Sequence, residues 1–417
     1  MLLKIPESRS LITKMMLERV ASAGFGTAIT TLVAVQPHVT WLPFHENGGI
    51  SGLAALGIIA VFGGIGALFS NSLGQSLVEK HGVRFSFVMS AIIQTIVVAA
   101  FLLAIIFHSV TSLGIIGLGV LSFVLSISTP GLSGLARAWW NEIGLSKTLA
   151  ARGGALEPTL AAIAWSVGPI IAAPIVLVSP WTIVVLGGGT ALGLLLLSKL
   201  PNPYKGTQQK INAPSVDVRT KSKGILRDWW MAGTYSFYHI ARSLLNSGST
   251  AVLLGAGQSG LIGAATAAPS VGHAIAGVAF AARKNPEANL KKAVMVGLLG
   301  QALPTLIIAS VFWIWPQPNM VATILLVVGG GAIIGILKAP VAAAIYPLAV
   351  ENRPEITVGR SASRIANGMI MGGLLGPLFG TVIIITMGTA WLLPFSVIAL
   401  AICACGVMLD GRITGAK

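Results

Sequence analysis

One stretch of the chain occurs twice. Residues 152–170 read RGGALEPTLAAIAWSVGPI, and residues 360–378 read RSASRIANGMIMGGLLGPL. The matching positions are Arg152, Gly168 and Pro169 in the first copy and Arg360, Gly376 and Pro377 in the second, 208 residues later. Both copies lie in apolar sequence, and the offset is about half of the 417 residues. This match predicts a duplicated architecture with two equivalent halves in the same orientation.

Hydropathy divides the rest of the chain in the same way. About twelve apolar segments have roughly the 20 residues that cross a bilayer as a helix. They are 15–36, 49–71, 85–107, 111–136, 153–178, 181–198, 229–254, 259–281, 292–315, 319–346, 361–387 and 389–409. The polar stretch 200–228 separates six from six and reads as a cytoplasmic linker. We therefore expect an N-terminal bundle over 1–199, a linker over 200–228 and a C-terminal bundle over 229–417.

The basic residues predict the orientation. Of 27 Lys and Arg, 25 lie before the first segment, after the last, or in and at the edges of alternate gaps. By the positive-inside rule, those gaps and both termini are cytoplasmic, in a multi-pass protein of the cell or inner membrane. The net charge of +15 is thereby explained by topology and lipid contact, so we expect no nucleic-acid partner. With 54% hydrophobic and 9% charged residues, a soluble fold is excluded.

These features together resemble the major facilitator superfamily. The resemblance implies an all-α membrane protein of twelve helices in two six-helix bundles. Residues 74–84 resemble the superfamily's loop motif between its second and third helices, with Glu79, Lys80, Gly82 and Arg84 in matching places. The resemblance implies a gate whose ion pairs change between states; solvated loop charges are the alternative.

The sequence Ser-Val-Gly-Pro on the fifth segment resembles the end of a motif typical of the superfamily's exporters. This suggests a drug/proton-antiporter-like exporter. Small residues at this place also permit close helix packing, and Gly376 and Pro377 repeat the pattern in the eleventh segment, so a shared packing role is the alternative.

The seventh segment carries the most informative polar pattern. Tyr235, His239, Arg242 and Asn246 are spaced by four, three and four residues, so they lie on one helix face. An arginine in mid-membrane costs about 2.5–3.5 kcal/mol on insertion scales and therefore faces protein or water. The resemblance implies that this helix and the tenth line a central cavity. We expect these residues to bind substrate; a structural tie between helices is the alternative for Arg242.

Lys338 on the tenth segment is the second stray cation. It either snorkels to the interface or joins Arg242 in a site that favours anions. For proton coupling the candidates are Glu157, whose pKa burial would raise into a range where the carboxyl takes up and releases a proton, and Glu18. A structural ion pair for Glu157 and an interfacial charge for Glu18 are the alternatives.

No enzyme signature, cofactor motif or metal-ligand spacing occurs in the sequence. We therefore expect a monomeric secondary transporter, a proton-coupled exporter of small organic molecules working by alternating access. Two alternatives stay open: an importer or exchanger of organic phosphates or carboxylates using Arg242 and Lys338, and a non-transporting receptor or scaffold.

Overall fold

The structure is a computed structural model, and it describes residues 6–41, 49–107, 109–129, 139, 147–200, 218–281, 290–315, 318–350 and 355–413. The chain divides into two compact units. The N-terminal unit comprises residues 1–209 and 259–270, and the C-terminal unit comprises residues 210–258 and 271–417.

Every predicted apolar segment corresponds to helix. The first six correspond to α1 (Pro6–Ala34), two successive parts of α2 (Gly52–Phe107), η2 with α3 (Val110–Leu113, Gly114–Ser128), α5 (Lys147–Val178) and α6 (Thr182–Leu197). The last six correspond to α7 (Val218–Gly255), η3 with α8 (Ser259–Leu261, Ile262–Ala281), α9 (Leu290–Ile314), α10 with η4 and α11 (Met320–Thr323, Ile324–Gly329, Gly330–Val350), α12 (Glu355–Met387), and η5 with α13 (Thr389–Trp391, Leu392–Ile413). The predicted fold class is confirmed: the protein is an all-α membrane protein.

Nine helical stretches of the described chain are both long and apolar enough to cross a membrane. The three predicted segments outside this set are those of α1, α6 and α7. Helix α6 has 16 residues, and α7 carries Arg242. Part of the predicted linker is helical, because α7 begins at Val218. Residues 201–217 of that linker lie outside the described residues.

One short hairpin interrupts the helices. Strand β1 (Val39–Thr40) pairs antiparallel with β2 (Gly49–Ile50), so that Val39 faces Ile50. No pattern in the sequence indicated it, because two residues per strand are too few for an alternating signal.

The chain turns at Gly82, between the two membrane-crossing parts of α2. Gly82 has φ 84° and ψ 167°. That backbone region is open essentially to glycine alone. The glycine of the predicted loop motif therefore redirects the chain, while the flanking Lys80 and Arg84 are exposed.

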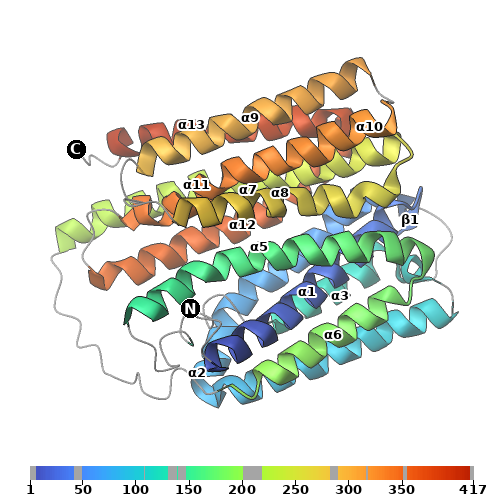
Figure 1. The fold of residues 1–417 in the computed structure, drawn as a ribbon, viewed down its shortest axis with the longest axis horizontal. Helices are drawn as coiled ribbons and strands as arrows, with labels where there is room; N and C mark the ends of the chain where they lie inside the picture. The colour runs from blue at the N-terminus through green and yellow to red at the C-terminus, as the bar shows by residue number, and fades with distance from the viewer. Residues whose placement is uncertain are drawn as a thin grey trace. The chain divides into compact units, whose positions relative to one another are not determined.

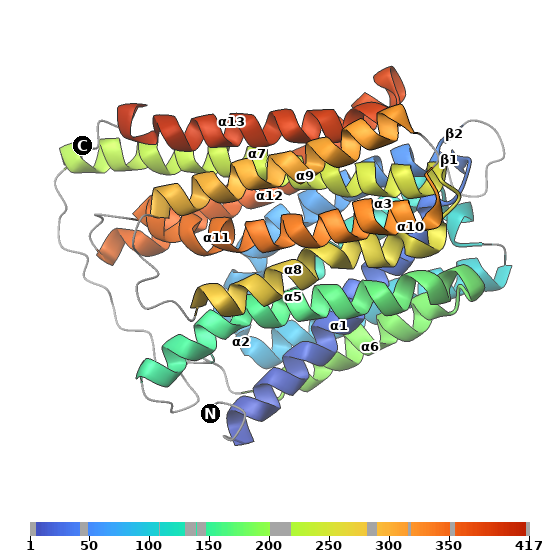
Figure 2. The same cartoon turned by 45° about the horizontal axis from the view of Figure 1, so that its top comes forward.

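The two units repeat one packing scheme. In the N-terminal unit, α1 packs against α5 and α6, and α2 packs against α3 and α6 (Figure 1). In the C-terminal unit, α7 packs against α12 and α13, and α9 packs against α11 and α13 (Figure 2). Thus α1 and α7 hold equivalent places in their units, as the duplicated sequence predicts.

The repeated glycines make the equivalent contacts. A Cβ at Gly168 of α5 would lie 2.7 Å from the backbone nitrogen of Gly24 in α1. A Cβ at Gly376 of α12 would lie 2.5 Å from the Cβ of Ser243 in α7. Both distances are shorter than van der Waals contact allows, so only glycine permits these helix approaches.

Helix α12 extends this arrangement along its length. Gly372 and Gly368, one and two turns before Gly376, also lie against the α7 backbone. The hydroxyl of Ser236 on α7 donates to the carbonyl of Gly368 at 2.8 Å. A glycine stripe with a spacing of four residues therefore fixes the register between α7 and α12.

Candidate functional site

A cluster of basic side chains forms inside the C-terminal unit. Helix α7 contributes Arg242 and His239, α11 contributes Lys338, and α8 contributes His273. The charges of Arg242 and Lys338 act on each other and on both imidazoles. Arg242, His239 and Lys338 are each partly exposed, so the cluster is neither sealed in the core nor on open surface. We call these four residues the basic cluster.

The two imidazoles carry unpaired polar atoms. Nε2 of His239 and Nδ1 of His273 are buried without a hydrogen-bond partner among the described residues. The sequence suggests that His273 bonds a carbonyl freed by Pro269, but its Nδ1 makes no such bond. A buried nitrogen without a partner costs about 1–3 kcal/mol. Such atoms are available to a bound molecule.

The cluster has no acidic counterpart in the membrane part of its own half. Residues 210–417 contain six carboxylates, Asp217, Asp228, Glu287, Glu351, Glu355 and Asp410, and all lie outside the predicted apolar segments. Like charges in a low-dielectric interior repel strongly unless a counter-charge is present. The arrangement can therefore attract an anion.

Aromatic rings support one side of the cluster. Tyr235 and Tyr238 stack with their centroids 5.6 Å apart, and each meets His239 edge-on, at 4.8 Å and 5.4 Å. Both tyrosines are buried in the apolar core of the unit. Beyond them, the side chain of Gln301 on α9 interacts with Tyr238 and donates to the carbonyl of Gly297 at 2.9 Å.

The predicted substrate-binding residues thus take different places. Arg242, His239 and Lys338 come together in the basic cluster. Tyr235 lies beneath them in the core, and Asn246 is exposed on α7. The sequence pattern places these α7 residues on one helix face about 100° wide. Packing then buries some of the side chains on that face and leaves others exposed.

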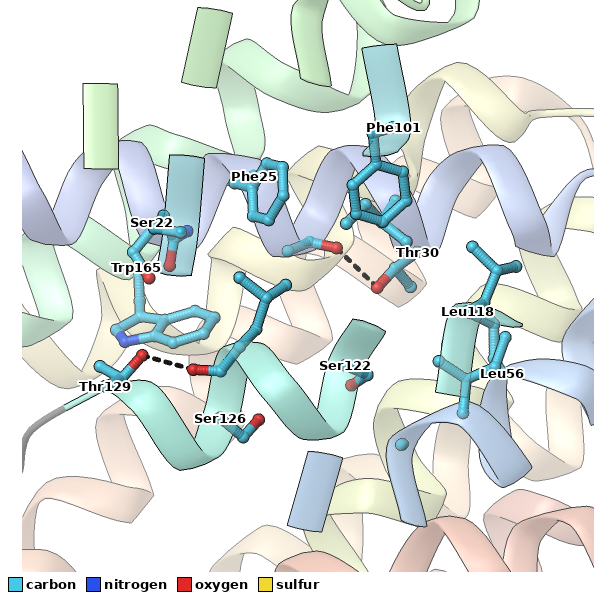
Figure 3. Close-up of a pocket in the computed structure, with 16 residues that line it drawn as sticks. Ser22, Phe25, Thr30, Leu56, Phe101, Leu118, Ser122, Ser126, Thr129 and Trp165 are labelled. Atoms are coloured by element: carbon cyan, nitrogen blue, oxygen red, sulfur yellow. Dashed lines mark hydrogen bonds between the residues drawn. The ribbon is translucent and has the colours of Figure 1, made fainter. Parts of the chain in front are cut away.

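The N-terminal unit contains a cavity of a different character. It has a volume of about 320 Å³ and lies among α1, α2, α3 and α5. Figure 3 shows Phe25 and Thr30 of α1, Trp165 of α5 and the hydroxyl groups of α3 around it. Every residue that lines it is uncharged; those with polar groups are Ser22, Thr30, Gln94, Ser122, Ser126, Thr129 and Trp165.

Some of its hydroxyls are already engaged with their own helices. Thr30 donates to the carbonyl of Gly26 at 2.8 Å, and Thr129 donates to that of Leu125 at 2.8 Å (Figure 3). Each keeps acceptor lone pairs for a ligand. The cavity therefore offers hydrogen bonds without charge. Sequence reasoning missed it, because its residues come from four separate helices.

The predicted proton-coupling and gating residues lie elsewhere. Glu18 of α1 is only 4% exposed, and Gly193 of α6 packs against its Cα. The side chains of four further residues on described helices, Glu79, Arg152, Glu157 and Arg360, lie outside the described part of the structure. Gly168 and Gly376, which precede Pro169 and Pro377, make the close helix contacts described above.

Within the described residues, no group of three or more His, Cys, Asp or Glu side chains could hold a metal ion. Inside the C-terminal unit, a metal ion at the two histidines would also face the positive charges of Arg242 and Lys338. The basic cluster is therefore unsuited to a cation.

Known structures share the fold over the full length. The chain is similar to a bacterial homologue of the iron transporter ferroportin in its inward-facing state, with 14% identity, TM-score 0.69 and coverage of 98% of this chain and 99% of that one. It is similar to the POT family transporter PepTSo, with 11% identity, TM-score 0.70 and 99% of each chain covered. A third structure, of a bacterial metal transporter, gives 13% identity and TM-score 0.63 over both whole chains.

No family model matches the sequence, and no curated protein matches it. At these identities the structural likeness establishes the fold and leaves substrate and coupling open. The chain therefore shares the fold of these transporter structures over its full length.

Proposed function

We propose that the protein is a secondary transporter that carries small organic anions across the membrane by alternating access. One observation carries the proposal: Arg242 and Lys338 interact within one basic cluster, and no carboxylate lies in the apolar segments of that half. Each cation costs about 2.5–3.5 kcal/mol to place in a membrane. An anionic solute provides the missing counter-charge.

The chemistry of the two cations favours a carboxylate or phosphate group. A guanidinium can donate two parallel hydrogen bonds to either group, and an ammonium adds a point charge. The partly exposed state of both side chains leaves them accessible to a solute. The charge preference comes from the basic cluster of the C-terminal unit.

Export and drug/proton antiport stay predictions of the sequence. Their motif on α5 packs α5 against α1, and its repeat packs α12 against α7 in the same way. This shared role accounts for Gly168 and Gly376 without reference to direction. A monomeric state and cytoplasmic termini in the cell membrane likewise stay predictions. Labelling single cysteines in the linker, after Cys403 and Cys405 are replaced, tests the orientation.

The test uses purified protein in liposomes and radiolabelled lactate, succinate and inorganic phosphate, with lactamide and succinamide as neutral counterparts. Flux is measured into empty vesicles and into vesicles loaded with the same solute. We expect at least one anion to be carried and its neutral counterpart to be excluded. Flux of neutral amides alone would refute anion transport, and no flux of any solute would favour a receptor or scaffold.

Variants of Arg242 test the anion-binding role of this residue directly. Arg242→Ala should abolish anion flux. Arg242→Lys should weaken binding, because lysine keeps the charge but cannot donate the two parallel hydrogen bonds of a guanidinium. Lys292→Ala is the matched control, since Lys292 is an exposed cation on α9. If Arg242→Ala retains anion transport and only lowers thermal stability, Arg242 is a tie between helices.

A further inference from the structure

Resting on the proposed anion transport, a second property of the basic cluster follows from its histidines. His273 is 8% exposed, and its Nδ1 has no partner among the described residues. Nε2 of His239 is also buried without a hydrogen-bond partner among the described residues. A neutral imidazole nitrogen without a hydrogen-bond partner can accept a proton, so these two histidines are the candidates for a proton site beside the proposed anion site.

The titratable and charged side chains near His239 come from two helices, α7 and α11. On α7 they are Tyr235, Tyr238 and Arg242, and on α11 the group is Lys338. Helix α12 presents Gly372, where an added Cβ would lie 2.7 Å from the Cβ of His239. No carboxylate is among these neighbours in the described chain. A proton on His239 therefore meets only positive charge from the protein.

The charged side chains that act on His273 are the same two cations. Lys338 and Arg242 act on it, and α8 approaches α11 closely because Gly272 lies against the backbone of Ala332. An anion bound at Arg242 and Lys338 changes the balance for both imidazoles. Its negative charge offsets the cations and attracts the added proton.

We propose that His239 and His273 take up a proton together with the anion bound at Arg242 and Lys338, so that solute and proton cross in the same direction. The proton comes from solvent, resides on an unpaired imidazole nitrogen while the anion is bound, and returns to solvent when the anion leaves. Because linkage is reciprocal, the factor by which the anion favours the proton is the factor by which the proton favours the anion. Coupling is therefore symport.

This coupling differs from the sequence-based expectation in two respects. It places the proton on α7 and α8 of the C-terminal unit, whereas Glu18 and Glu157 lie on α1 and α5. It also predicts symport, whereas a drug/proton antiporter exchanges its solute for a proton. The two schemes move protons in opposite directions during uptake.

The experiment uses full-length protein in liposomes with the membrane potential clamped to zero. Lactate, succinate and inorganic phosphate are tested in turn, and a pH dye is sealed inside. An inward anion gradient should acidify the lumen. With lactate and one proton per anion, an external pH one unit lower should drive accumulation of about tenfold.

Substitution by glutamine separates binding from coupling, because glutamine keeps a polar side chain and does not titrate. In His239→Gln, His273→Gln and the double variant, anion exchange between loaded vesicles measures folding and binding, and the ratio of pH-driven accumulation to exchange measures coupling and should fall below the wild-type ratio. In the double variant, pH-driven accumulation should fall to about one. His38→Gln, at an exposed position after α1, should behave as the wild type.

Each remaining outcome is decisive. Anion flux without proton movement, luminal alkalinisation, or full coupling in the double variant would overturn the symport inference and leave anion transport standing. Loss of coupling in Glu18→Gln or Glu157→Gln alone, with the double histidine variant coupled, would assign the proton to a carboxylate. Absence of anion flux in the wild type would overturn both proposals.

Discussion

The close contact between α7 and α12 at Gly372 leaves no room for a larger residue. In the structure, a Cβ added at Gly372 would lie 2.3 Å from the carbonyl oxygen of Ser236 and 2.7 Å from the Cβ of His239. Ordinary contact begins near 3.4 Å, and the backbone oxygen cannot swing away. The Gly372→Ala variant must therefore separate the helices by about 1 Å, and overpacking of this kind costs about 1–3 kcal/mol.

The adjacent residue provides the matched control. No atom lies within 4 Å of a Cβ at Gly373. In the Gly373→Ala variant only helix propensity changes, and this favours alanine by up to about 1 kcal/mol. The two substitutions add the same methyl group one position apart, so their difference reports the packing contact. The gain in helix propensity is common to both variants and cancels, so we expect a difference in unfolding free energy of about 1–3 kcal/mol between them.

Thermal unfolding in detergent, followed by tryptophan fluorescence, measures this difference. At about 2–4 °C per kcal/mol for units of this size, Gly372→Ala should unfold roughly 2–12 °C below Gly373→Ala. Because the displaced backbone carries His239, Gly372→Ala should also reduce anion transport by more than its neighbour. Melting temperatures of the two variants within about 2 °C would refute the close contact.

Three further predictions concern the same architecture. Gly168→Ala should lower unfolding free energy by about 1–3 kcal/mol through its contact with α1, whereas Gly188→Ala, with open space around it, should not; thermal unfolding distinguishes them. Gly82→Ala should cost about 1–3 kcal/mol, because alanine does not tolerate φ 84°, and a smaller loss would argue against this turn. Ser396→Ala should cost about 1 kcal/mol, since its buried hydroxyl donates to the carbonyl of Ala241 at 2.8 Å; an unchanged midpoint would contradict that bond.

The sequence was sufficient for the fold because the bilayer imposes simple rules. A crossing helix needs about 20 apolar residues whatever it packs against, and twelve such segments could be counted. The match between the residues around Gly168 and Gly376 predicted equivalent halves, and the structure places both glycines at equivalent helix contacts. Hydropathy did not indicate the two-residue strands or the start of α7 at Val218.

The site was predictable only in part. A charge in an apolar segment is visible without any structure, which is why Arg242 and Lys338 were found. Their common location and the arrival of His273 beside them depend on how α8 and α11 pack within the C-terminal unit. Helical periodicity gives the face on which a side chain lies, and it does not give the partner helix.

The sequence by itself thus determined the number of spans and the segments that carry unusual charge, and it predicted their orientation. These properties follow from the transfer of each segment between water and lipid, which depends on its own residues. Only the tertiary structure decided that Tyr235 belongs to the core, that glycines on α12 set the register with α7, and that four helices enclose an uncharged cavity. Those outcomes depend on contacts between distant segments, where close packing selects among faces that the sequence leaves equivalent.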